Sequence, residues 1–141
     1  MMTDPLSAYR QTRVKTAGQG RLIVMLYDES LRQIDIAERE MRTQGPRLDT
    51  VHNAIVKAQD ILTELMVSLD FEKGGDIAAN LFNLYMFFNQ RLVDANMTKD
   101  PAGLVEVRDM LTELRGAWAA IENQAPAKGD LEESGGVNLA G

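Results

Sequence analysis

The sequence predicts an all-α protein: an antiparallel up-and-down four-helix bundle with an extended N-terminal arm and a disordered C-terminal tail. Four segments of roughly 20 to 24 residues carry apolar side chains at helical spacing. Short connections containing Gly or Pro separate these segments, so neighbouring helices are expected to run antiparallel. No strand is needed to explain the pattern, and 141 residues suffice for one core. We therefore divide the chain into an arm (1–17), a bundle (18–123) and a tail (124–141).

The first two predicted helices each have a readable apolar face and a clear end. The first spans residues 19–42 and ends before Gly45-Pro46. Its core stripe consists of Ile23, Leu26, Tyr27, Ile34, Ala37 and Met41. The second spans residues 48–71 and ends at Gly74-Gly75, with Val56 and Val67 lying off its apolar face.

The last two predicted helices begin at capping residues. Asp76 is the expected N-cap of the third helix, which runs to about residue 97. At the start of the fourth, Asp100 caps and Pro101 occupies the first helical position. The fourth helix has one conventional apolar stripe and ends before Gln124. No helical period continues beyond that residue, so the tail is expected to be disordered.

The third helix carries more apolar surface than a small bundle needs, arranged as two adjoining stripes. The core stripe is predicted to be Ile77, Leu81, Leu84, Tyr85, Phe88, Leu92 and Ala95. The second stripe is Ala78, Phe82, Met86 and Val93, interrupted only by Asn89. Together they span an arc of roughly 200°. Two interpretations are open: neighbouring helices cover the whole arc, or the second stripe receives a partner.

Composition and charge restrict the compartment and the partners. The net charge is −6, with +3 on residues 1–21 and −2 on the tail, which leaves −7 on the body of the chain. An acidic body argues against nucleic-acid binding, because a phosphate footprint needs a basic surface. Apolar runs such as residues 22–26 and 85–88 are too short for membrane insertion. The N-terminus lacks the apolar run of a secretory signal, so a cytoplasmic protein is expected.

Residues suited to catalysis or metal binding are scarce. There is no Cys and only one His, so a nucleophile and a base are hard to assemble. Asp49-x-x-His52 has the spacing of a carboxylate-bridged metal motif, but no second motif accompanies it, and His52 is interpreted as a helix-surface residue. Gly18-Gln19-Gly20 is too short for a phosphate-binding loop. No catalytic residue, cofactor or metal is expected, and the protein is predicted not to be an enzyme.

The arm contains Ala8-Tyr9 and Val14 in an otherwise polar and basic stretch. These apolar residues either anchor the arm in a surface groove or are incidental to a disordered arm. Composition leaves both interpretations open.

A series of motifs follows in order along residues 8–121. The first runs from Ala8-Tyr9 through Val14-x-Thr16-Ala17 to Leu22-Ile23-x-Met25-Leu26-Tyr27-Asp28. The others are Ala58-Gln59-x-Ile61-Leu62-x-Glu64-Leu65, Leu69-Asp70, Gly74-Gly75-Asp76-Ile77-Ala78, Asn80-Leu81, Leu84-Tyr85, Arg91-Leu92, Ala95-Asn96 and Trp118. Together these motifs resemble the flagellar secretion chaperone family FliS. The chain departs from the family pattern at Gly18-Gln19-Gly20, where a Ser-Pro pair is frequent, and at Gln90-Arg91, where two Arg residues are frequent.

The resemblance implies a cytoplasmic chaperone that binds the C-terminal segment of flagellin, prevents its premature polymerisation and delivers it to the flagellar type III export gate. It also implies that the client is disordered when free and forms helices in apolar grooves, and that no ATP is used. The arm residue Tyr9 is implied to lie at the client site or to cover it.

These observations lead to a site hypothesis and an alternative function. The client-binding groove is predicted to consist of Val56, Val67, Ala78, Phe82, Met86 and Val93, with Tyr9 and Val14 as a movable cover or client contact. We expect a monomer when free and a 1:1 complex with the client. The alternative is a helical adaptor that self-associates or binds a regulator of flagellar gene expression.

Overall fold

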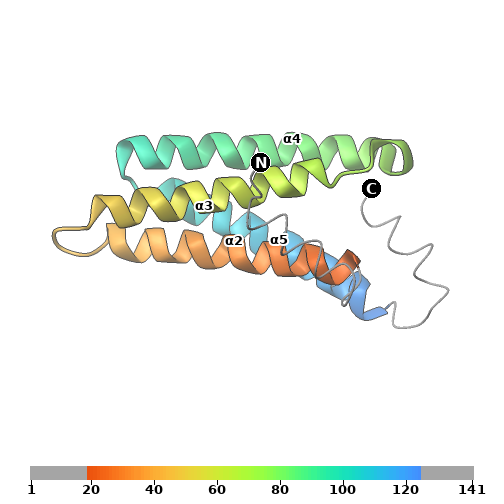
Figure 1. Cartoon of the computed structure of the whole chain (residues 1–141), viewed down its shortest axis with the longest axis horizontal. Coiled ribbons are helices and arrows are strands. Elements are labelled where there is room, and N and C mark those ends of the chain that lie inside the picture. Colours follow the sequence, from red (N-terminus) through yellow and green to blue (C-terminus); the bar gives the residue numbers. More distant parts are fainter. Residues whose placement is uncertain (1–18, 125–141) are drawn as a thin grey trace, which may run out of the picture.

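Four helices make up the part of the chain that the structure, a computed structural model, describes: residues 19–124 (Figure 1). Helix α2 spans Gln19–Met41, α3 Leu48–Val67, α4 Phe71–Thr98 and α5 Ala102–Gln124. The predicted all-α four-helix fold is confirmed. The predicted arm, residues 1–17, and residues 125–141 of the predicted tail lie outside the described residues.

The four helices form an antiparallel, up-and-down arrangement in which successive helices reverse direction (Figure 1). Helix α2 packs against α3 and α5, and α4 packs against the same two helices, so α2 and α4 lie diagonally across the bundle. Helix α2 contacts α3 and α5 more extensively than α4 does. Six of the nine exposed large apolar residues in the described part accordingly belong to α4.

The connection between α3 and α4 differs from the sequence prediction. Helix α3 ends at Val67 rather than at residue 71, and α4 begins at Phe71 rather than after Asp76. The side chain of Asp70 accepts a hydrogen bond from Lys73 N at 3.0 Å, which caps an earlier turn. Gly75 then interrupts the helix with φ 50° and ψ −124°. The glycine therefore marks a break inside α4 and not the end of α3.

The connection between α4 and α5 follows the prediction. Lys99 adopts the left-handed conformation and its N–H donates to Ala95 O at 2.7 Å, which closes the end of α4. Asp100 Oδ1 accepts from Ala102 N at 3.0 Å, so Asp100 caps the first turn of α5 as expected.

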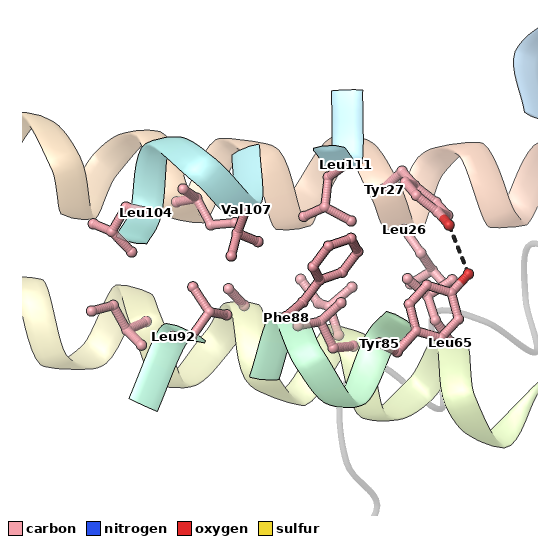
Figure 2. Close-up of a cluster of buried hydrophobic side chains, with 14 of the residues drawn as sticks. Leu26, Tyr27, Leu65, Tyr85, Phe88, Leu92, Leu104, Val107 and Leu111 are labelled. Atoms are coloured by element: carbon pink, nitrogen blue, oxygen red, sulfur yellow. Dashed lines mark hydrogen bonds between the residues drawn. The ribbon is translucent and has the colours of Figure 1, made fainter. Parts of the chain in front are cut away.

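The core contains buried aliphatic and aromatic side chains from all four helices (Figure 2). Tyr27 and Tyr85 are fully buried at 0% and 1% exposure, and their hydroxyl oxygens lie 2.7 Å apart, a hydrogen bond between diagonal helices. Phe88 and Leu92 continue the α4 contribution, facing Val107 and Leu111 of α5. The four helices thus share one apolar core, which contains the hydrogen bond between the two tyrosine hydroxyl groups.

Two residues at the start of the predicted third helix exchange roles. Ile77, predicted in the core stripe, is 63% exposed, whereas Ala78, predicted in the partner-facing stripe, is 0% exposed. The buried α4 residues Ala78, Tyr85 and Leu92 repeat at intervals of seven, a period of 3.5. Closely packed antiparallel helices follow this period, and it drifts by about 20° per heptad from a 3.6-residue wheel. A straight wheel therefore misplaces residues at the helix end.

Candidate functional site

The second apolar stripe of α4 lies on the side of that helix that faces α3. Gln59 Nε2 of α3 donates to Asn89 Oδ1 of α4 at 3.0 Å, which fixes the direction in which Asn89 points. At about 100° per residue, Phe82, Met86 and Val93 lie within roughly 60° of Asn89 around α4. The stripe therefore follows the junction of α3 and α4 along most of its length.

We define the α3–α4 face as the surface formed at this junction. It consists of Val56, Gln59, Met66 and Val67 from α3 and Phe71, Phe82, Met86, Asn89 and Val93 from α4. Val67 is 66% exposed, Phe71 51%, Met86 49% and Phe82 36%, and the other five are half-buried. Contiguous exposed apolar side chains of this kind mark interaction sites. Fully covering one large apolar side chain contributes about 1.5–3 kcal/mol.

The break at Gly75 adds an aromatic residue to this face. It allows residues 71–74 to form a separate turn, and the ring of Phe71 meets the ring of Phe82 edge-on, with centroids 6.0 Å apart and an interplanar angle of 64°. Edge-to-face pairs at this separation are favourable. The pair leaves both rings partly open to solvent, so it forms an aromatic end to the face.

The contacts that join the helices differ between the sides of the bundle. Ion pairs link α5 to its neighbours: Arg115 contacts Asp28 of α2 at 2.7 Å, and Arg91 of α4 contacts Glu106 at 2.7 Å. Across α3 and α4, hydrogen bonds between polar side chains join the helices: Gln59 with Asn89, and His52 Nδ1 with Asn96 Nδ2 at 2.9 Å. The α3–α4 face thus combines apolar side chains with neutral amides.

The predicted groove residues divide into three groups. Val67, Phe82 and Met86 are exposed, and Val56 and Val93 are half-buried. Ala78 is fully buried, so its prediction as a groove residue is wrong, because it belongs to the heptad seam described above. The predicted cover residues Tyr9 and Val14 lie outside the described residues.

Sequence reasoning did not assign Met66, Phe71 or Gln59 to this face. Phe71 was placed at the end of the preceding helix. Asp70 was an available signal, since Asp is a preferred N-cap residue. Gln59 had no signal, because its role depends on which helix lies beside it.

A second apolar area lies on the other side of α4, toward α5. Ile77 and Phe87 are exposed at 63% and 39%. Leu84, which the helical spacing places between Ile77 and Phe87, is half-buried. The Arg91–Glu106 ion pair joins α4 and α5 beyond these residues. Helix α4 therefore presents apolar side chains on both of its flanks.

No helix within residues 19–124 is both long and apolar enough to cross a membrane. In the same region, no group of three or more His, Cys, Asp and Glu side chains is placed to hold a metal ion. His52 instead forms the contact with Asn96.

Comparisons with known proteins agree with one another. The family model described as "FliS: Flagellar protein FliS" matches residues 2–125. The chain is similar to the flagellar secretion chaperone FliS of Bacillus subtilis (strain 168), with 32% identity over 95% of this chain and 96% of the relative. It is also similar to the flagellar secretion chaperone FliS of Salmonella typhimurium, with 35% identity over 85% of this chain and 91% of the relative.

A third relative is the flagellar secretion chaperone FliSB of Pseudomonas aeruginosa, 35% identical over 80% of this chain and 88% of the relative. Nearly the full length of each relative is therefore represented, and the resemblance seen in the sequence is confirmed. The family is one of chaperones and not of enzymes, which implies a client protein in flagellar export. The chain belongs to the FliS family of flagellar secretion chaperones.

Proposed function

We propose that this chain binds the C-terminal segment of flagellin in the cytoplasm, prevents its premature polymerisation and delivers it to the flagellar type III export gate. The observation that carries the proposal is the α3–α4 face, where four large apolar side chains remain exposed beside a well-packed core. Membership of a secretion chaperone family supports a client protein as the occupant of this face.

The face suits an amphipathic helix. Met86 and Phe82 lie one helical turn apart on α4, and Val93 continues their row two turns beyond Met86. A client helix laid along the α3–α4 junction would place apolar side chains against this row in the helix-in-groove mode. Met side chains adapt to irregular partners, which suits Met66 and Met86 for this role. Binding would be coupled to folding of the client helix and would need no nucleotide.

The predicted arm has a place in this proposal. Tyr9 and Val14 would cover part of the α3–α4 face in the free chaperone or contact the client in the complex. A cover that contributes about 1.4 kcal/mol would weaken the apparent client affinity tenfold. Such a cover favours a true client over casual apolar peptides.

Calorimetric titration of a flagellin C-terminal peptide into the full chain tests the proposal. We expect a 1:1 complex and a large negative heat-capacity change, because apolar burial is coupled to folding of the peptide. Phe82→Asp is expected to weaken binding at least tenfold, since it places a charge beneath the client helix. Ile121→Asp is the matched control, because Ile121 has nearly the same exposure, 38% against 36%, but lies on α5.

Both variants must retain the circular dichroism of the parent. A folded Phe82→Asp protein that binds the peptide unchanged would contradict the assignment of the face. Equal losses in both variants would contradict its restriction to the α3–α4 junction. Absence of binding by the parent chain would contradict the proposed client.

The second apolar area, formed by Ile77 and Phe87, favours a second candidate function. A bundle with exposed apolar side chains on two flanks can hold a regulator of flagellar gene expression or another copy of itself. Self-association predicts a dimer without client, whereas the chaperone proposal predicts a monomer. Sedimentation across a range of concentrations separates these outcomes.

A further inference from the structure

The hydrogen-bonded amides of Gln59 and Asn89 interrupt an otherwise apolar row. On α4, Asn89 lies between Met86 and Val93, and on α3, Gln59 lies between Val56 and Met66. Both amide side chains are half-buried and are joined by a 3.0 Å hydrogen bond. A polar pair in the middle of an apolar face must be accommodated by whatever covers that face.

The pair leaves unused hydrogen-bonding capacity. Among the described residues, Gln59 Oε1 and Asn89 Nδ2 have no hydrogen-bond partner, so an acceptor and a donor remain. If the oxygen and nitrogen of both amides are interchanged, Asn89 donates to Gln59 instead, and one amide again keeps a free donor group and the other a free acceptor. Neither atom is buried without a partner, so both are open to solvent in the free protein. A helix that covers the face excludes that solvent and leaves both atoms unsatisfied unless it replaces the bonds.

We propose that Gln59 and Asn89 select a client helix that carries a carboxamide side chain, Asn or Gln, within its apolar stripe. This inference rests on the proposed client-binding function of the α3–α4 face. A carboxamide presents one acceptor and a donor in a single plane, which matches the free donor of Asn89 and the free acceptor of Gln59. A carboxylate supplies no donor for Gln59, and an ammonium group supplies no acceptor for Asn89.

Such a contact sets the register of the client. Apolar side chains alone permit a docked helix to slide by one turn, because the row repeats every three or four residues. A client carboxamide meets Gln59 and Asn89 in only one of these positions. A wholly apolar client stripe would bury both free atoms without partners in every position. The pair therefore determines specificity and register, while Phe82 and Met86 provide apolar contact.

A double-mutant cycle between chaperone and client tests this inference. Synthetic peptides of the flagellin C-terminal segment, each with one Asn or Gln replaced by Leu, are titrated into the parent chain and into Gln59→Leu/Asn89→Leu. We expect one peptide position at which the replacement weakens binding to the parent about tenfold. In the double variant the same replacement should have no cost or should strengthen binding, because no chaperone amide is left unpaired.

Gln90→Leu is the matched control. Gln90 is the amide next to Asn89, but it is exposed and donates to Asp94 Oδ1 at 3.2 Å on its own helix. We expect this variant to show the same pattern of peptide affinities as the parent. If Gln59→Leu/Asn89→Leu does not fold, as judged by circular dichroism, Asn89→Ala replaces it and is expected to show the same non-additivity.

The outcomes separate the two proposals. Peptide replacements whose effects are equal in the parent and the variant would overturn the selection of a carboxamide, since a merely structural tie between α3 and α4 gives additive losses. Under that outcome, tight binding of the unmodified peptide would leave the proposed client in place. A parent chain that binds none of the peptides would overturn both proposals.

Discussion

Tyr27 Oη and Tyr85 Oη lie 2.7 Å apart and connect α2 with α4, the two helices that are diagonal in the bundle. The rings meet edge-on with centroids 6.4 Å apart, and both side chains are fully buried (Figure 2). Buried hydroxyl groups need partners, and each of these phenols supplies one for the other. The pair therefore constrains how α4, the less extensively packed of the two helices, sits against α2.

Removing one hydroxyl of this pair should lower the free energy of unfolding by more than half of the loss caused by removing both. Tyr27→Phe leaves the buried Tyr85 hydroxyl without its phenolic partner, and we expect a loss of about 1–3 kcal/mol in the free energy of unfolding. Tyr85→Phe should cost less, because Trp118 also hydrogen-bonds the Tyr27 hydroxyl. Tyr27→Phe/Tyr85→Phe should lose less than the sum of the single variants. Urea unfolding followed by circular dichroism measures these differences. Strictly additive losses would show that the hydroxyl groups are not coupled.

The same pair predicts loss of stability at alkaline pH. Burial raises the pKa of Tyr85 to about 12. The pKa of Tyr27 is also raised above its ordinary value, mainly by burial and secondly by electrostatic interaction with Tyr85. The folded state therefore keeps both protons when the unfolded chain, with tyrosine pKa values near 10.0, begins to release them. Stability is unaffected below pH 10 and falls as the pH rises toward 12, by up to about 1.4 kcal/mol per pH unit for each tyrosine.

Tyrosinate absorbance in Tyr9→Phe measures this effect, because Tyr27 and Tyr85 are then the only tyrosines. We expect no absorbance change near pH 10 and a cooperative rise that coincides with loss of helical circular dichroism. A gradual titration near pH 10 in the folded protein would contradict the buried, paired arrangement.

Replacing two glycines by Ala should have opposite effects on stability. Gly75 has φ 50° and ψ −124°, a conformation that strains any residue with a Cβ, so Gly75→Ala should lower the free energy of unfolding by about 1–3 kcal/mol. Gly116 lies inside α5 and a Cβ there meets nothing within 4 Å, so Gly116→Ala should raise it by about 0.5–1 kcal/mol. Thermal unfolding of both variants provides the measurement. Stabilisation by Gly75→Ala would contradict the break in α4.

Local signals sufficed for most of the fold. The Gly45-Pro46 turn and the Asp100-Pro101 cap ended and began helices where expected, because capping depends on nearby atoms. The α3–α4 connection was predicted incorrectly because Asp76 was taken as the cap, whereas Asp70 caps the helix in the structure. The turn that Asp70 caps also carries the contact between Phe71 and Phe82, which a local pattern does not contain.

The candidate face was predictable only in part. Phe82 and Met86 were placed in a second stripe and are exposed in the structure, but their role as client contacts stays a prediction. Ile77 and Ala78 exchanged roles because the buried residues of α4 repeat every 3.5 residues, whereas the helical wheel assumes 3.6 residues per turn. The amide bridge between Gln59 and Asn89 required knowledge of which helix lies beside α4.

The methionines of the bundle are suitable reporters of where the client lies. Methyl resonances of methionine-labelled full chain are followed while a flagellin C-terminal peptide is added. Met66 and Met86 of the α3–α4 face should shift and saturate at one equivalent of peptide, whereas Met41 at the end of α2 should not. Saturation with Met41 shifted and both Met66 and Met86 unchanged would contradict client binding at this face.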